Sequence, residues 1–209
     1  TMKQGTGNVM GFLTGYPCCL SNLHQGYPKF TQNLWLRSSD GGLAALAYSP
    51  CKVSADVAGV QVEINEVTSY PYGDVIRIEV NPSESVAFPL SVRIPSWTVA
   101  PQVKVNGKQL EEVKAGEIFV IDREWTEYDI LELHFPMKVT ISRWFENSAT
   151  VERGPLVYAL DVKGNWEKKI NQLGDRKGQE YWEVKPASPW NYSLIQTDIN
   201  TPEESFKYN

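Results

Sequence analysis

Two adjacent cysteines, Cys18 and Cys19, are the residues of this chain whose chemistry is most informative. A disulfide between sequence neighbours would distort the peptide that joins them, whereas two soft sulfurs at one point suit a thiophilic metal such as zinc. A zinc-bound thiol is deprotonated and therefore nucleophilic. The pair could be a ligand set, a nucleophile or both. The alternatives are two small core residues, because free cysteine is often buried, and a redox pair.

Zinc takes four ligands in most protein sites, and this chain offers two convincing ones. His24 follows the pair closely enough to approach it. Cys51 lies at the start of an expected strand, where we expect a buried thiol, with a third metal ligand as the alternative. The sequence therefore predicts that the remaining ligands come from outside these 209 residues.

Other catalytic arrangements are not visible in the sequence. It contains no glycine-rich phosphate loop, Ser-His-Asp arrangement or HExxH helix. A glycosidase needs two groups, usually carboxylates, that flank the bond to be cleaved, but the carboxylates here show no diagnostic spacing. We interpret Asp122 and Glu124, on either side of Arg123, as a solvated turn, and His134 as a structural residue of a strand.

The residues around the cysteine pair show the period of an amphipathic helix. Its apolar positions recur at steps of three and four: Leu20, Leu23, Tyr27, Phe30 and Leu34. Ser21 or Asn22 is the expected N-cap. The cysteines would then lie just before the helix start, where the helix dipole favours a thiolate. Pro28 either kinks this helix or is its first residue.

From Leu43 to Leu160 the chain reads as short strands separated by turns. Tyr70–Asp74 and Asn106-Gly107 are the clearest hairpin turns. Strands at this spacing, without amphipathic helices between them, predict an antiparallel β-sandwich of jelly-roll type. The alternating pattern predicts these core residues: Leu90, Val92, Ile94, Leu131, Leu133 and Phe135. We also expect three tryptophans at strand ends to close the core: Trp97, Trp125 and Trp144.

The tail after Asp161 has a different character. Gly164–Gly178 is polar and reads as a loop or short helix, and Tyr181–Val184 as a strand. Two roles stay open for the aromatic residues in this tail, packing in a core and stacking on a sugar: Trp182, Trp190 and Tyr192.

Composition excludes several classes of function. The formal net charge is -5 and the basic residues are scattered, so we expect no nucleic-acid partner. No apolar run reaches the length of a membrane helix. Three cysteines, two of them adjacent, do not form a secreted disulfide framework. No signal peptide is visible at Thr1, and the compartment stays open, with a periplasmic or secreted location included. Because Thr1–Thr14 forms no clear first element, we expect a fragment of a longer protein.

Five motifs together resemble one family. Cys18-Cys-Leu-Ser-Asn22 resembles the Cys-Cys-x-x-Asn signature of the β-L-arabinofuranosidases, glycoside hydrolase family 127 and its relatives. The later motifs follow in the family's order: Leu90-Ser-Val-Arg-Ile-Pro-Ser-Trp97, Val103-Lys-Val-Asn-Gly107, Arg123-Glu-Trp125 and Glu152-Arg-Gly-Pro-Leu-Val-Tyr158. The resemblance covers about residues 10–160 and extends weakly to Ser188–Tyr192.

The resemblance implies an (α/α)6 barrel with the active site, followed by β-sandwich domains. It implies that Cys18 is the nucleophile, that Cys18 and Cys19 both bind Zn²⁺, and that barrel residues outside this chain complete the zinc shell and supply the acid/base. The implied reaction is retaining hydrolysis of L-arabinofuranosides or related plant glycans. Many members have an Arg-containing helix where this chain continues Leu-His-Gln-Gly-Tyr-Pro, so we assign His24 to substrate binding.

We therefore expect three parts: residues 1–40 as the end of the catalytic barrel, 41–160 as the β-sandwich, and 161–209 as an irregular extension that packs on the sandwich. The expected partners are a carbohydrate substrate and the upstream barrel of the same polypeptide, and the chain alone is expected to be inactive. The alternative function is a non-catalytic carbohydrate-binding or supporting module. A thiol redox protein is disfavoured, because no Cys-x-x-Cys motif is present.

Overall fold

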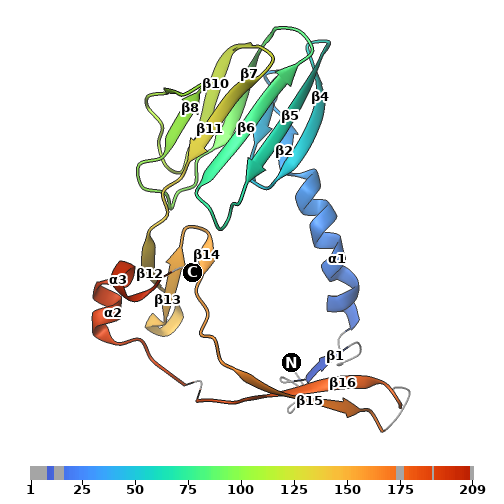
Figure 1. The fold of residues 1–209 in the computed structure, drawn as a ribbon, viewed down its shortest axis with the longest axis vertical. Helices are drawn as coiled ribbons and strands as arrows, with labels where there is room; N and C mark the ends of the chain where they lie inside the picture. The colour runs from blue at the N-terminus through green and yellow to red at the C-terminus, as the bar shows by residue number, and fades with distance from the viewer. Residues whose placement is uncertain (1–8, 12–16, 173–176, 190, 208–209) are drawn as a thin grey trace. The chain divides into compact units, whose positions relative to one another are not determined.

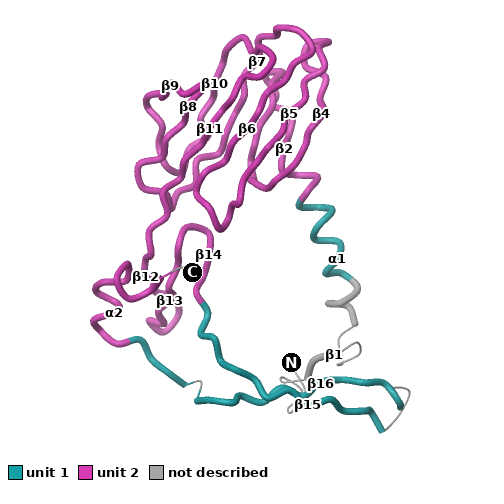
Figure 2. Tube along the Cα trace, viewed as in Figure 1, with its two compact units in different colours: residues 1–30, 159–194 teal, residues 31–158, 195–209 magenta. Residues whose placement is uncertain are grey.

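The structure is a computed structural model that describes residues 9–11, 17–172, 177–189 and 191–207, with side chains from Asn22 onward. The chain divides into two compact units (Figure 2). One consists of residues 1–30 and 159–194, the other of 31–158 and 195–209. Most strands (Figure 1) lie within residues 31–158 and so belong to the second unit. Among the described residues, no helix has the length and apolar character that crossing a bilayer requires.

The second unit contains a six-stranded sheet in the order β4-β5-β6-β11-β8-β9. All its neighbouring strands are antiparallel. The strands are β4 (Cys51–Val57), β5 (Val60–Thr68), β6 (Val75–Pro82), β11 (Asp129–His134), β8 (Gln102–Val105) and β9 (Lys108–Gln109).

A four-stranded sheet, in the order β10-β7-β3-β2, forms the other layer of the sandwich. Its strands are β10 (Ile118–Trp125), β7 (Val86–Arg93), β3 (Leu43–Ala45) and β2 (Trp35–Arg37). The pairing of β3 with β7 is parallel and the others are antiparallel. Gly42 permits the close approach of β3, because a Cβ there would lie 1.9 Å from the carbonyl oxygen of Pro89.

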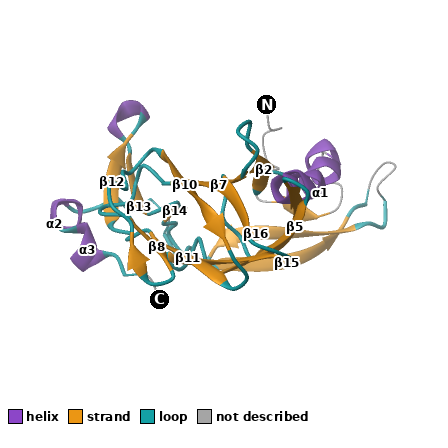
Figure 3. Cartoon of the chain, turned by 90° about the horizontal axis from the view of Figure 1, so that it is seen from above, coloured by secondary structure: helices purple, strands orange, loops and turns teal. Residues whose placement is uncertain are grey.

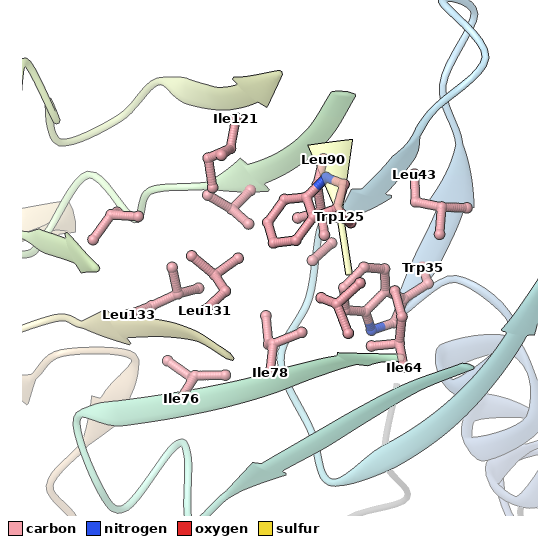
Figure 4. Close-up of a cluster of buried hydrophobic side chains, with 14 of the residues drawn as sticks. Trp35, Leu43, Ile64, Ile76, Ile78, Leu90, Ile121, Trp125, Leu131 and Leu133 are labelled. Atoms are coloured by element: carbon pink, nitrogen blue, oxygen red, sulfur yellow. The ribbon is translucent and has the colours of Figure 1, made fainter. Parts of the chain in front are cut away.

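The core lies between these two sheets and is built from the inward positions of each strand (Figure 4). The residues predicted for it from alternation are all at most 1% exposed: Leu90, Val92, Ile94, Leu131, Leu133 and Phe135. Trp125 is fully buried, and its indole N–H donates to the carbonyl of Phe88. Trp97 packs against the core and meets the ring of Phe135 edge to face. The predicted mainly antiparallel sandwich is therefore confirmed.

The expected turns join the expected strands. Asn106 and Gly107 both have positive φ angles, 49° and 79°, as a two-residue turn of type I′ requires. Between β5 and β6, the N–H groups of Tyr72 and Gly73 donate to the carbonyl of Ser69. These local signals set the register that brings the alternating apolar residues to one face.

A small sheet of three strands follows the sandwich within the same unit: β12 (Val139–Arg143), β13 (Ala149–Arg153) and β14 (Leu156–Val157). The 3-10 helix η1 (Phe145–Asn147) connects β12 and β13. Two short helices, α2 (Gln196–Asn200) and α3 (Pro202–Ser205), belong to this unit, and α3 lies against β12 (Figure 3). The Glu203 carboxylate accepts a hydrogen bond from the N–H of Val139, which ties α3 to β12.

The first unit contains α1 (Pro17–Gln32) up to Phe30 and a three-stranded sheet in the order β1-β16-β15. The strands are β1 (Val9–Gly11), β15 (Gly164–Ile170) and β16 (Glu180–Pro186). The strand predicted near Tyr181 is present as β16. The expectation of a loop or short helix from Gly164 is wrong, because β15 pairs with β16 along its length.

Two other local expectations are wrong. Trp144 is 65% exposed, because β12 belongs to the small sheet rather than to the sandwich core. Asp122 and Glu124 lie within β10 on its solvent face rather than in a turn. Sequence alternation did not reveal which sheet the strand before Trp144 would join, and Asp122 and Glu124 are solvated as expected, although they lie in a strand. The expected domain boundary at residue 40 stays a prediction, although β2 already pairs within the sandwich.

Candidate functional site

The structure places Cys18 and Cys19 in the first turn of α1, which begins at Pro17. The expectation that they precede the helix is therefore wrong by one turn, and neither Ser21 nor Asn22 is its N-cap. Proline suits the first helical position because its fixed φ matches the helix and its missing N–H would have no partner there. The partial positive charge of a helix N-terminus favours a thiolate in the first turn as well.

His24 lies on α1 and is exposed. It follows Cys19 by five residues and Cys18 by six, which correspond to rotations of about 500° and about 600° around a helix of about 3.6 residues per turn. The helix period therefore brings His24 to neither cysteine's face. Pro28 lies inside the helix, so the alternative in which the helix begins at Pro28 is wrong.

Within the described part of the chain, no three His, Cys, Asp or Glu side chains are grouped so that they could hold a metal ion. The thiols of Cys18 and Cys19 lie outside the described side chains. Their residue type fits zinc, because two soft sulfur donors stand next to each other in the sequence. The zinc assignment stays a prediction.

Sequence reasoning missed a buried carboxylate, Glu66, which is 1% exposed. Its oxygens accept hydrogen bonds from the Trp35 indole N–H at 3.0 Å, the Ser49 N–H at 2.9 Å and the Cys51 thiol at 3.8 Å. A signal for it was present: on β5, Glu66 continues the inward alternation of Val62 and Ile64. These bonds connect strand β2, the segment that precedes β4, strand β4 itself and strand β5.

The Glu66 cluster has perturbed acid–base properties. Burial raises the pKa of the Glu66 carboxyl, and its hydrogen-bond donors only partly oppose this. Burial, together with the neighbouring carboxylate, raises the pKa of the Cys51 thiol to about 11. Cys51 is thus a protonated, half-buried donor, as the buried-thiol interpretation expected. A hollow of about 410 Å³ lies beside it, lined by Thr31, Gln32, Leu34, Trp35, Ser49, Pro50, Cys51, Lys52, Val53 and Ser54.

The motif residues of the sandwich have structural roles. Arg93 donates to the carbonyl of Leu46, while its own carbonyl accepts from the Tyr48 hydroxyl at 2.7 Å. Arg153 donates to the Tyr72 carbonyl and thereby links β13 to the β5–β6 turn. Gly154 has φ 58°, and a Cβ there would lie 2.8 Å from the Met137 sulfur. These residues fix the positions of loops and sheets rather than carry chemistry.

A second buried carboxylate, Asp129, ties two further motifs together. It accepts from the Asn106 amide at 2.6 Å and the Thr126 N–H at 2.9 Å, and it pairs with Arg123 at 3.4 Å. Arg123 also lies over the Trp125 ring, 5.1 Å from its centroid. Burial alone would raise the pKa of Asp129, but these hydrogen bonds and the guanidinium outweigh burial and lower it. His134, on β11, is paired with Asp74 at 3.3 Å.

The tail aromatics remain partly exposed. Trp182 on β16 is 41% exposed and meets Trp166 of β15 edge to face, with ring centroids 6.5 Å apart. Tyr192 is 65% exposed. Trp190 lies outside the described residues.

Comparison with known proteins gives a family. Residues 42–137 match the family described as the β-L-arabinofuranosidase, GH127 middle domain. A search of curated proteins finds no match. Among solved structures, a GH127 β-L-arabinofuranosidase from Geobacillus stearothermophilus T6 is similar, with 25% identity and a TM-score of 0.62. The similarity covers 86% of this chain and 32% of that protein.

Two further structures share the fold at 21% identity. One is described as a glycoside hydrolase, with a TM-score of 0.64 over 88% of this chain and 35% of its own. The other is a GH127 β-arabinofuranosidase, with a TM-score of 0.61 over 80% of this chain and 35% of its own. The chain thus spans about a third of the length of these proteins. The resemblance predicted from the motifs is confirmed: residues 42–137 match the β-L-arabinofuranosidase, GH127 middle domain, and the chain resembles a GH127 β-L-arabinofuranosidase in structure.

Proposed function

We propose that this chain is the C-terminal portion of a retaining glycoside hydrolase that acts on L-arabinofuranosides or related plant glycans, with Cys18 as its nucleophile. The observation that carries the proposal is the match of residues 42–137 to the GH127 middle domain. The similarity to a GH127 β-L-arabinofuranosidase over 86% of the chain supports it. The Cys-Cys-x-x-Asn motif in the first turn of α1 supplies the nucleophile.

The reaction proceeds in two displacements. The Cys18 thiolate attacks the anomeric carbon, so that a C–S bond forms while the glycosidic C–O bond breaks, and a general acid from the upstream barrel protonates the leaving oxygen. Water, deprotonated by the same group, then attacks the anomeric carbon and breaks the C–S bond. Two inversions give overall retention. The position of Cys18 in the first turn of α1 favours the thiolate form that the first step needs.

Cys18 and Cys19 would hold a zinc ion together with ligands from the upstream barrel. When bound, zinc keeps the thiols ionised at neutral pH. Cys19 serves as a ligand, and His24 is assigned to the substrate rather than to the metal.

The upstream barrel of the same polypeptide is the proposed partner of α1. The helix carries large apolar side chains at helical spacing that are exposed: Leu23 (69%), Tyr27 (74%) and Phe30 (48%). An amphipathic helix is stabilised mainly by burying such a stripe against a neighbour. The relatives have about two thirds of their length outside the region of similarity, which supports a further domain as that neighbour.

The test measures hydrolysis of an aryl arabinofuranoside by the full-length parent, its Cys18→Ser variant and this chain alone. We expect turnover with retained anomeric configuration by the parent, a loss of at least about a hundredfold in Cys18→Ser, and none by the chain, because general acid catalysis alone contributes about 10²–10⁴-fold. Full activity of the parent carrying Cys18→Ser would refute the nucleophile. Turnover by this chain alone would refute the need for the barrel.

The alternative is a non-catalytic sandwich that binds carbohydrate or supports its neighbour. The structural roles of Arg93, Arg153 and Gly154 favour it for the sandwich itself. It predicts that the full-length parent has no activity that depends on Cys18, so the same experiment separates the two functions.

A further inference from the structure

A polar groove crosses the outer face of the six-stranded sheet. One hollow of about 410 Å³ lies over β4, β5 and β6, and a smaller one of about 130 Å³ lies over β6 and β11. The two share Glu79 and Asn81, so they form one groove across four strands that are neighbours in the sheet (Figure 1). The first is lined by Lys52, Val53, Ser54, Glu63, Ile64, Asn65, Glu79 and Asn81, and the second by Arg77, Glu79, Asn81, Tyr128 and Ile130.

Strand register builds this groove from rows of cross-strand neighbours. Lys52 lies opposite Asn65, Asn65 opposite Glu79, and Glu79 opposite Ile130. A neighbouring row places Glu63 opposite Asn81. Adjacent strands lie about 4.8 Å apart, so a row of four strands spans about 14 Å.

The polar groups in the middle of the groove are held in place before any ligand binds. The Glu79 carboxylate accepts hydrogen bonds from the Asn65 amide at 3.0 Å and from Arg77 Nε at 3.2 Å. These bonds, with Asn65 the larger contribution, lower the pKa of Glu79 and keep it ionised. Fixed acceptors and donors lose little freedom when a ligand binds, so they favour recognition.

Tyr128 stands at the end of the groove in a conformation that its residue type disfavours. Its φ is 68°, in the left-handed region that glycine and asparagine occupy more readily. Its N–H donates to the Asn81 side chain at 2.9 Å, yet its ring is 73% exposed. The neighbouring Glu127 side chain raises the pKa of the Tyr128 hydroxyl. A tyrosine that is mostly exposed thus occupies a backbone position that glycine would adopt without strain.

We propose that this groove binds a neutral oligosaccharide, with Tyr128 as the stacking surface for one sugar ring and with Asn65, Glu79 and Asn81 as hydrogen-bond partners of its hydroxyls. Within the lining, Lys52 and Arg77 balance Glu63 and Glu79, and the Glu127 carboxylate beside Tyr128 disfavours an anionic ligand. Carboxylate and amide groups pair with adjacent hydroxyls, and an aromatic face accepts the C–H face of a sugar. The choice of a glycan as the ligand class rests on the proposed function. The geometry of the groove does not depend on that function.

The decisive variant is Tyr128→Gly in this 209-residue chain. Glycine adopts the φ of this position without strain, so we expect a melting temperature no lower than that of the parent chain. We also expect at least a tenfold loss of affinity for arabino-oligosaccharides, measured by calorimetric titration. Tyr72→Ala is the matched control, because Tyr72 is also exposed (60%) and lies outside the groove lining. It should bind as the parent does.

Several results would overturn the proposal. These are no binding by the parent chain at millimolar glycan, equal affinity of the parent and Tyr128→Gly, or a Tyr72→Ala loss as large as that of Tyr128→Gly. Binding of an unrelated peptide with the same dependence on Tyr128, or self-association that Tyr128→Gly abolishes, would show a different occupant. The binding measurement does not depend on hydrolysis. Failure of the Cys18→Ser experiment therefore leaves the glycan-binding result valid, and failure of the binding experiment leaves the assignment of the nucleophile valid.

Discussion

At the scale of single residues, Glu66 shows how a buried charge can join several elements. All three of its partners, the Trp35 indole, the Ser49 amide and the Cys51 thiol, are donors. The ionised carboxylate therefore suits the hydrogen bonds, while burial disfavours the charge and raises the pKa. Protonation of the Glu66 carboxylate reduces the number of hydrogen bonds it can accept, but it also removes the free-energy cost of burying a negative charge.

A pH prediction follows for Glu66. Because its pKa is raised in the folded protein, its contribution to stability is fully present below the ordinary value of 4.5 and is lost as the pH rises through the raised pKa. Glu66→Gln cannot ionise, so the difference in unfolding free energy between this variant and the parent should shift in favour of the variant as the pH rises. Urea unfolding from about pH 4 to about pH 8 measures this difference.

Glu66→Ala is the contrasting variant. It leaves the Trp35 and Ser49 donors buried without an acceptor, and each such group costs about 1–3 kcal/mol. It should be destabilised across the whole pH range. A pH-independent difference between Glu66→Gln and the parent would contradict the assigned pKa shift.

At the scale of elements, alternation along a strand decides which side chains are buried. On β11, Leu131 and Leu133 are fully buried, while Glu132 between them faces solvent and pairs with Lys104 at 3.9 Å. The same period brings Asn65, Glu79 and Ile130 to the outer groove. One strand therefore serves the core with one face and the proposed glycan groove with the other.

Leu133→Ala tests this arrangement. Removing a fully buried leucine leaves a cavity and should destabilise the chain by about 2–5 kcal/mol. Glu132→Ala, the adjacent residue on the opposite face, should change stability by less than about 1 kcal/mol, because surface ion pairs contribute little. Chemical denaturation of both variants compares the two faces directly. Equal stabilities would mean that the assigned inward face is wrong.

At the scale of the whole molecule, the described residues contain one complete sandwich and only a small part of what the relatives contain. The chain spans about a third of the length of the glycoside hydrolase structures it matches. In the proposed function the active site depends on an upstream barrel, since Cys18 and Cys19 lie at the start of the helix whose apolar side chains are exposed.

Zinc content tests this dependence. Two thiolates leave a zinc ion half-coordinated, and tight structural sites use four ligands. After dialysis, this chain should carry well under one zinc per molecule by elemental analysis, while the full-length parent should retain about one. Stoichiometric zinc in the chain alone, lost in Cys19→Ser but kept in Cys51→Ser, would show that a site forms without the barrel.

The sequence by itself determined the sandwich, its main hairpins and the family resemblance. Period-two alternation and the Asn106-Gly107 turn are local signals, because side-chain direction and turn φ angles depend on neighbouring residues. The motif order identified the β-L-arabinofuranosidase resemblance that the comparison confirmed. The cysteine pair was singled out by residue type alone, and its chemistry remains a proposal.

The tertiary structure alone decided which faces meet and which charges are buried. Trp125 and Trp144 both follow strand-like runs, yet one is fully buried and the other 65% exposed, because their strands join different sheets. Glu66 and Glu79 lie on paired strands, but one faces the core and the other the groove. Alternation along β5 and β6 is consistent with these opposite faces, but which sheet a strand joins and which donors meet a buried charge depend on contacts between residues far apart in the chain.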